Sequence, residues 1–216
     1  MKIAVLGTGG VGQAIATKLI NVGHEVKMGS RTSNNEKASA WVASAGSKAS
    51  QGTFAEAAAF GEIIFSCTKG DATLSVLKLV GENNMDGKIL IDISNPLDFS
   101  KGMPPTLFIC NDNSLGETIQ TTYPNVKVVK TLNTMNSVVM VNPALIPGDH
   151  SVFVCGNDAN AKTETKKLLN SFGWADKNII DVGDITNARG TEQLLPIWIR
   201  LLGVMGHANF NFHIAK

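Results

Sequence analysis

The chain has 216 residues, of which 44% are hydrophobic and 17% are charged. Such a chain is long enough for one or two compact domains, and its low charge content excludes a disordered protein, in which charge exceeds what apolar burial can offset. Nineteen basic and eighteen acidic side chains leave a net charge of +1. This balance argues against nucleic acid or an anionic membrane as the partner and favours a small molecule.

Cysteine and histidine positions argue against a disulfide framework and a metal site. The three cysteines are odd in number and far apart, and the four histidines lack the spacing of zinc ligands. The first apolar run, Ile3–Leu6, is too short for a signal peptide, and the longest one, Leu194–Met205, is interrupted by Pro196 and Arg200. We therefore expect a cytoplasmic protein with no metal and no membrane partner.

A strand–helix–strand unit opens the chain. Lys2–Leu6 is a short aliphatic run before a glycine-rich turn, which is typical of a buried strand in a parallel sheet. Apolar residues then recur at helical spacing from Val11 to Val22, Gly23 ends the helix, and Glu25–Met28 forms a second strand. This order predicts a right-handed βαβ unit.

Strands and helices alternate through the rest of the chain. We predict strands at residues 63–67, 88–93, 127–131, 151–155 and 179–182, and helices at 37–45, 74–80, 162–172 and from Thr191 onward. This alternation predicts an α/β protein with a doubly wound parallel sheet, the Rossmann fold. The pattern loosens after residue 135, so we expect a dinucleotide-binding domain at residues 1–135 and a small C-terminal α/β domain at 136–216 that closes the site.

The turn between the first strand and the first helix has the pattern G-x-G-x-x-G and consists of Gly7, Thr8, Gly9, Gly10, Val11 and Gly12. The first glycine permits a sharp turn, the second lets the backbone approach a pyrophosphate, and the third lets the helix pack closely on the strand. The helix N-terminus then presents unpaired N–H groups and a positive dipole end to an anion. In this context the motif predicts dinucleotide binding rather than a merely structural turn.

The end of the second strand indicates which dinucleotide is bound. NAD sites have a carboxylate there for the ribose hydroxyls, whereas this chain has Ser30, Arg31 and Thr32. Two hydroxyls and a guanidinium suit a 2′-phosphate, which favours NADP(H). The alternative is that Arg31 is an ordinary solvated arginine in a loop.

Small polar residues follow the other strands, where the ligand of an open α/β sheet lies. They are Thr68, Lys69, Ser94, Asn95, Pro96, Asn133 and Thr134. We expect Thr68, Lys69, Asn95 and Asn133 to contact the cofactor, although Asn-Pro and Ser-Asn pairs are also frequent simply because they form turns.

No acid–base pair is evident. Tyr123 and Lys127 have the Y-x-x-x-K spacing of short-chain dehydrogenases, but Pro124 and Asn125 indicate a turn there and not one helix face. Lys69 is the remaining candidate for a catalytic group, and a lysine in this position is more often a solvated side chain or a cofactor contact. An acceptor ring that itself holds negative charge, such as a flavin or deazaflavin, needs little help of this kind.

The chain resembles the NADP oxidoreductases that depend on coenzyme F420, over essentially its whole length. The resemblance is carried by 7–12, by 23–26 and 29–31, by 91–97, by 130–134, and by Ala188, Arg189 and Glu192. It implies direct hydride transfer between a nicotinamide and a stacked deazaflavin, with Thr8–Val11 at the pyrophosphate and Ser30 and Arg31 at the 2′-phosphate. The Thr68-Lys69-Gly70 segment departs from the apolar residue and proline frequent in the family, which leaves the acceptor open.

The final segment allows two interpretations. Arg189, Glu192 and the apolar run that contains Trp198 either close the acceptor pocket or pack the small domain and pair with a second subunit in a homodimer. The sequence thus predicts an NADP(H)-dependent oxidoreductase that exchanges hydride with a flavin-like or F420 acceptor. Two alternatives stay open: a carbonyl or imine reductase that uses Lys69, and a non-catalytic NADP(H)-sensing protein.

Overall fold

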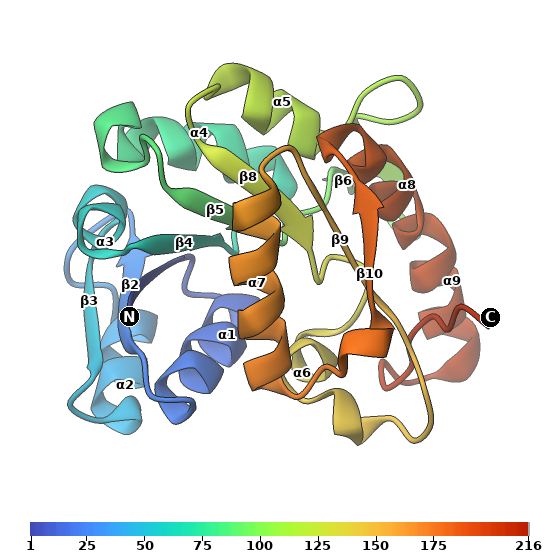
Figure 1. Ribbon diagram of the computed structural model, residues 1–216, viewed down its shortest axis with the longest axis horizontal. Helices are drawn as coiled ribbons and strands as arrows, with labels where there is room; N and C mark the ends of the chain where they lie inside the picture. Colours follow the sequence, from blue (N-terminus) through green and yellow to red (C-terminus); the bar gives the residue numbers. More distant parts are fainter. Residues whose placement is uncertain (216) are drawn as a thin grey trace.

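The computed structural model, which describes residues 1–215, is built on one eight-stranded sheet with helices on both faces (Figure 1). The strand order is β10-β9-β8-β5-β4-β1-β2-β3. The strands are β1 (Lys2–Leu6), β2 (Glu25–Ser30), β3 (Ala49–Thr53), β4 (Ile63–Ser66), β5 (Ile89–Asp92), β8 (Lys127–Thr131), β9 (Val152–Gly156) and β10 (Ile179–Gly183). A separate two-stranded hairpin consists of β6 (Leu97–Asp98) and β7 (Thr106–Leu107).

Helices cover the sheet in two layers, each with its own hydrophobic core. One face packs against α1 (Gly10–Asn21), α2 (Glu36–Ala45), α6 (Ser137–Val141) and α7 (Ala159–Phe172), and the other against α3 (Phe54–Phe60), α4 (Gly70–Val80), α5 (Leu115–Thr122) and α8 (Ala188–Gln193). Strands that are buried on both faces become nearly continuous apolar runs, as in β1 and β4. The predicted Rossmann architecture is confirmed.

The order in which successive strands are added to the sheet reverses at β1, the topological switch point of the sheet. β1 pairs in parallel with β2 on one side and with β4 on the other, and the chain reaches β4 only after β2 and β3. In open α/β sheets such a reversal leaves a crevice outside the carboxyl ends of the strands. The glycine turn after β1 and the residues after β4 therefore meet at one edge of the sheet.

The C-terminal part of the chain extends this same sheet. β9 runs antiparallel to β8, because the connection through α6 (residues 132–151) turns back beyond the carboxyl end of β8 without crossing the sheet, and β10 is parallel to β9. The sheet is therefore continuous across residue 135, and the division into domains 1–135 and 136–216 stays a prediction about folding units.

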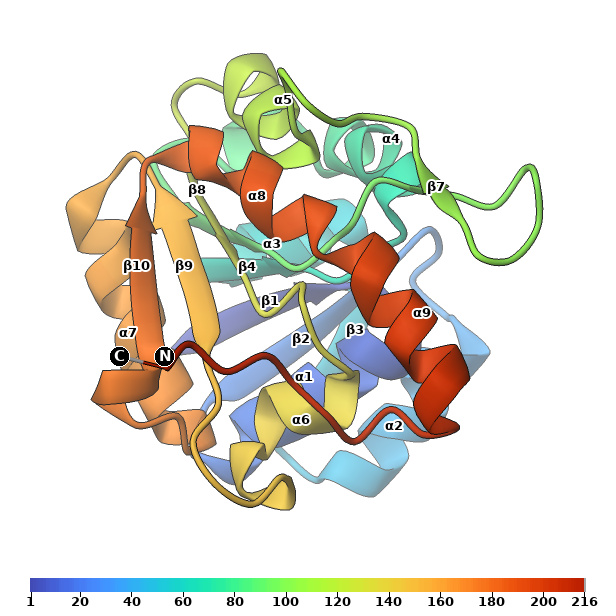
Figure 2. The same ribbon diagram turned by 90° about the vertical axis from the view of Figure 1, so that its right-hand side faces the viewer.

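Helix α9 (Leu195–Met205) and the segment after it cross the molecule outside the sheet (Figure 2). Leu195, Trp198, Ile199 and Phe210 form a third, small core there, against which Leu97 of the hairpin packs. Within residues 1–215, every helix is too short or too polar to traverse a lipid bilayer.

Candidate functional site

The glycine turn after β1 is shaped by two close backbone approaches. Gly7 has φ +123°, and a Cβ there would lie 2.8 Å from the carbonyl oxygen of Cys67. A Cβ on Gly12 would lie 2.1 Å from the carbonyl oxygen of Gly7, so only glycine lets α1 start this close to β1. Gly9 and Gly10, by contrast, have nothing within 4 Å of a Cβ position, so their outer side faces open space.

The N-terminus of α1 has no internal counter-charge. Gly9 supplies no side-chain cap and the first turn holds no acidic residue, whereas α2, α3, α5 and α7 are capped by Asn35, Thr53, Ser114 and Asp158. The first N–H groups of α1 and its positive dipole end are thus left for an external anion. The Gln13 side chain donates to the Thr8 carbonyl oxygen at 3.0 Å and stiffens the turn.

A cavity of about 500 Å³, called here the β2 cavity, lies between the glycine turn and the end of β2. Its lining comprises Gly7, Thr8, Gly9, Gly29, Ser30, Arg31, Thr32, Asn35, Phe54, Cys67, Thr68, Lys69, Ala72 and Val76. The charged members, Arg31 and Lys69, are both cations. A cavity with two cations and no carboxylate in its lining fits a nucleotide that carries a 2′-phosphate.

The three residues predicted to hold this phosphate differ in availability. The Ser30 hydroxyl is buried and donates to the Thr32 carbonyl oxygen at 2.5 Å, so its hydrogen already has a partner within the turn. Arg31 and Thr32 are exposed, and no ion pair engages Arg31 among the residues described. The geometry therefore favours Arg31 and Thr32 as donors, with Ser30 holding the turn.

A second cavity of about 950 Å³, the hairpin cavity, lies between the glycine turn and the β6–β7 hairpin. Its lining comprises Val11, Cys67, Thr68, Lys69, Gly70, Asp71, Ile93, Ser94, Asn95, Leu97, Asp98, Phe99, Ser100 and Phe108. It shares Cys67, Thr68 and Lys69 with the β2 cavity, so the residues after β4 form the wall between the two. This size and mixture of rings with a few polar groups are typical of small-molecule sites.

Lys69 stands at the N-cap of α4, where its ammonium makes no hydrogen bond or ion pair with the described part of the chain. Nearby, burial raises the pKa of the Cys67 thiol far above its ordinary value, with a smaller contribution from the Asp92 carboxylate. The thiol therefore stays protonated at neutral pH and is a poor nucleophile. Tyr123 caps α5 and Lys127 begins β8, so their spacing does not place them on one helix face.

Asn95 and Asn133, from the ends of β5 and β8, lie side by side. The Asn95 amide donates to the Asn133 carbonyl oxygen at 2.9 Å, and the Asn133 amide donates to Asn95 Oδ1 at 2.9 Å and to the Thr191 carbonyl oxygen at 3.2 Å. Asn95 lines the hairpin cavity, whereas the buried Asn133 and Thr134 line neither cavity. The pair thus ties the cavity wall to α8.

A fully buried ion cluster lies directly behind this wall. Lys130 Nζ is 2.8 Å from Asp92 Oδ2, 2.8 Å from Glu192 Oε1 and 2.5 Å from the Ser94 carbonyl oxygen, so each of its three hydrogens has an acceptor. Burial opposes the charged ammonium, but the Asp92 and Glu192 carboxylates outweigh it and raise the pKa of Lys130 above its ordinary value. The charged cluster fixes Ser94 at the rim of the hairpin cavity.

The carboxylates of this cluster have further donors. Asp92 Oδ1 accepts the N–H of Ser94 at 3.1 Å and its hydroxyl at 2.7 Å. Glu192 accepts the N–H groups of Leu115 at 2.9 Å and Gly116 at 3.1 Å, so it serves as the anion at the N-terminus of α5. Of the two roles open to Glu192 from the sequence, closing the acceptor pocket or packing the C-terminal part, these contacts fit packing. The burial of Lys130 and Asp92 as a pair was not predicted.

Arg189 and Trp198 are engaged within the chain. Arg189 forms a two-pronged pair with Glu117 of α5, with Nε 2.8 Å from Oε2. Trp198 is 9% exposed and stacks on Phe210 with ring centroids 5.1 Å apart. Neither residue lines either cavity. Across residues 1–215, the His, Cys, Asp and Glu side chains form no group of three or more suited to a metal ion.

Comparisons with known proteins agree with this geometry. Residues 2–96 match the family described as NADP oxidoreductase, coenzyme F420-dependent. A crystal structure from Arthrobacter sp. FB24, provisionally described as an F420-dependent NADP-reductase, is 52% identical with a TM-score of 0.94 and 100% of both chains covered. The chain belongs to this family. The predicted NADP-dependent oxidoreductase class is thereby confirmed.

Two proteins that are less similar to this F420-dependent oxidoreductase family member are described by other activities. Metalloreductase STEAP3 of Rattus norvegicus is 28% identical over 203 residues, which cover 91% of this chain, and the chain spans only 38% of the length of that relative. An imine reductase of Myxococcus stipitatus in complex with NADP+ is 18% identical with a TM-score of 0.65, covering 95% of this chain and 64% of its own. The latter likeness shows a shared fold.

The different surroundings of Gly12 and Gly9 predict different effects of an alanine substitution at each position. Gly12→Ala should lower the free energy of unfolding by at least about 2 kcal/mol, because its methyl group collides with backbone. Gly9→Ala should lower it by less than about 1 kcal/mol yet weaken NADPH binding at least about tenfold, because the methyl group occupies the space a pyrophosphate needs. Urea unfolding and NADPH titration measure the two effects. Unchanged NADPH affinity in Gly9→Ala contradicts the cradle.

The ion cluster predicts that the two lysines of β8, Lys130 and Lys127, contribute very differently to the free energy of unfolding. Lys130→Met leaves two buried carboxylates without a cation and should lower the free energy of unfolding by about 3–5 kcal/mol. The control Lys127→Met breaks only a partly exposed pair with Asp158 at 3.5 Å and should change it by less than about 1 kcal/mol.

The loss in Lys130→Met should also depend on pH. The Asp92 and Glu192 carboxylates raise the pKa of Lys130 in the folded protein above its ordinary value. The stabilisation from this ammonium is therefore fully present below the pKa of an unfolded lysine, about 10.4, and is lost as the pH rises through the folded-state pKa. The stability difference between the parent protein and Lys130→Met should be constant between about pH 7 and about pH 9 and should shrink above about pH 10. A difference that does not shrink at alkaline pH in urea unfolding contradicts a charged cluster.

Proposed function

We propose that this protein transfers hydride between NADP(H), held along the β2 cavity and the glycine turn, and a flavin-like or deazaflavin ring in the hairpin cavity. The single observation that carries the proposal is the pair of cavities divided only by the residues after β4. NADPH supplies a hydride and leaves as NADP+, while one proton reaches the reduced acceptor from solvent. The protein's task is to bind and align two rings.

Each part of the nucleotide has residues suited to it. The N–H groups of the glycine turn and of the first residues of α1, from Thr8 to Val11, face the pyrophosphate. Arg31 and Thr32 hold the 2′-phosphate, with Ser30 shaping their turn. Thr68 and Lys69 lie beside the ribose, and the Asn95–Asn133 pair forms the wall at the nicotinamide end.

The composition of the hairpin cavity supports an acceptor that needs no acid–base partner. Its lining holds no histidine or tyrosine, and Lys69 is its one basic side chain. Phe99 and Phe108 offer ring surfaces for a flat acceptor. A flavin or F420 ring fits these walls better than a small carbonyl compound.

Two alternatives remain as competing proposals. A carbonyl or imine reductase would use Lys69 to polarise its substrate, and the fold is shared with imine reductases. A non-catalytic NADP(H) sensor would use only the nucleotide part of the site. We further propose a homodimer, because the outer face of α9 exposes Ile197, Val204 and Met205.

Arg31 predicts the choice of cofactor. Arg31→Ala should weaken NADPH binding about 10- to 100-fold through loss of charge-assisted hydrogen bonds, and leave NADH binding nearly unchanged. Titration of both nucleotides by fluorescence gives the ratio, with Arg200→Ala, an exposed arginine outside both cavities, as the control. An unchanged NADPH to NADH ratio overturns the phosphate assignment.

An acceptor panel tests the reaction. NADPH absorbance is followed with flavins, coenzyme F420, quinones, a ferric chelate, and a cyclic imine. We expect oxidation with ring acceptors, and Lys69→Met should retain more than about a tenth of that rate because no side-chain proton is required. Activity confined to the imine and abolished by Lys69→Met establishes the reductase alternative. Unchanged absorbance with every acceptor, despite NADPH binding, establishes the sensor.

A further inference from the structure

The hairpin cavity combines ring surfaces with an unusual set of charges. Phe99 and Phe108 on the hairpin are 53% and 43% exposed, and Val11, Ile93 and Leu97 complete an apolar lining. A flat aromatic ring gains contact area against such walls. The charged members of the lining are the two carboxylates of Asp71 and Asp98 and the ammonium of Lys69.

Neither carboxylate has a cation bound to it within residues 1–215. Asp71 lies in the first turn of α4, so the positive end of that helix is already compensated by the chain's own carboxylate and attracts no external anion. Asp98 accepts the N–H of Ser100 at 2.8 Å, and this hydrogen bond, with Lys101 nearby as a weaker influence, holds the pKa of Asp98 below its ordinary value. The Asp98 carboxylate is therefore ionised at neutral pH.

The neighbouring β2 cavity has the opposite character. Its charged lining residues are Arg31 and Lys69, and it includes no carboxylate. Lys69 belongs to the dividing wall, where the phosphates of a bound dinucleotide compete for its charge. When the nucleotide is bound, its phosphates therefore offset the charge of Lys69. The charge that remains in the lining of the hairpin cavity is then that of the Asp71 and Asp98 carboxylates.

We propose that Asp71 and Asp98 are specificity-determining residues that make the hairpin cavity select flavin-type rings with uncharged substituents and reject those whose phosphate enters the cavity. This inference rests on the proposed function for the class of ring. The two carboxylates repel a phosphate dianion that enters the cavity, whereas they accept hydrogen bonds from the hydroxyls of a neutral ribityl chain. An acceptor with an anionic tail must keep that tail outside the cavity.

Riboflavin and FMN provide the test, because they share one ring and differ by the phosphate. At about 20 mM ionic strength we expect the KM for FMN to exceed that for riboflavin about tenfold or more, with similar kcat. Raising the ionic strength to about 0.5 M should narrow the ratio to about threefold, because salt screens the repulsion. Dissociation constants in the NADP+ complex, from flavin fluorescence, should show the same ratio without requiring turnover.

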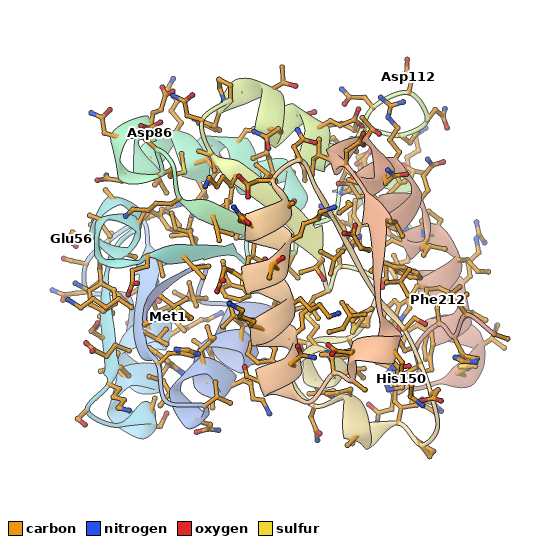
Figure 3. The ribbon with its side chains drawn as sticks, in the orientation of Figure 1. Met1, Glu56, Asp86, Asp112, His150 and Phe212 are labelled. Atoms are coloured by element: carbon orange, nitrogen blue, oxygen red, sulfur yellow. The ribbon has the colours of Figure 1, made fainter. Side chains whose placement is uncertain are left out.

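The same Asp→Asn substitution at three positions separates the effect of carboxylates in the cavity from the effect of the protein's net charge. Asp71→Asn and Asp98→Asn should each narrow the FMN to riboflavin ratio about two- to fivefold, mainly by improving FMN. Asp86→Asn changes the net charge equally, but Asp86 is exposed on the far side of the molecule from the hairpin and α9 (Figure 3), so its ratio should match the parent protein.

The outcomes distinguish this inference from the function on which it rests. Equal affinity for riboflavin and FMN, or a ratio that Asp71→Asn and Asp98→Asn leave unchanged, overturns the charge selection even if both flavins are reduced. Charge-selective flavin binding without NADPH oxidation supports the selection and rejects the hydride transfer. Absence of flavin binding by any form of the protein overturns the charge selection, and the proposed hydride transfer is then decided by coenzyme F420 in the acceptor panel.

Discussion

One ammonium group holds together the part of the molecule where the cavities meet. Lys130 comes from β8, Asp92 ends β5, and Glu192 lies on α8 and also receives two N–H groups of α5. Each of these groups is costly to bury alone, so the four elements are stable only in the arrangement that brings the charges together. The Ser94 carbonyl oxygen is the third partner of Lys130, and through it the cluster fixes the wall of the hairpin cavity.

Short-range patterns predicted most of the sheet and the glycine turn between β1 and α1. The aliphatic runs of β1, β4, β5 and β8, the helical period of α1 and the glycine turn are each encoded within a few residues, and the structure places them as expected. The availability of Arg31 and the involvement of Ser30 in its own turn could not be predicted, because they depend on the fold of the turn.

Elements with weak local signals were missed. β3 has the sequence ASQGT, which lacks the aliphatic residues of a strand, and α3 follows it without a loop. The Thr53–Glu56 capping box was a usable sign of the start of α3. The reversed direction of β9 and the cluster of Asp92, Lys130 and Glu192 depend on residues tens of positions apart, and a single sequence contains no signal that pairs them.

The end of the described chain explains how α9 keeps its position. After Gly206 the backbone returns to β9, where the Ser151 N–H donates to the Phe212 carbonyl oxygen at 2.8 Å, and His150 and Phe212 lie near each other in Figure 3. The Asn211 side chain donates to the Ser151 carbonyl oxygen and to His150, each at 2.9 Å. Helix α9 is therefore a strap fastened at both ends, by α8 before it and by this tail after it. Phe210 of the tail stacks on Trp198 of α9, and Leu97 of the hairpin packs against the same small core. A change in the position of the tail would therefore alter the packing at the base of the hairpin.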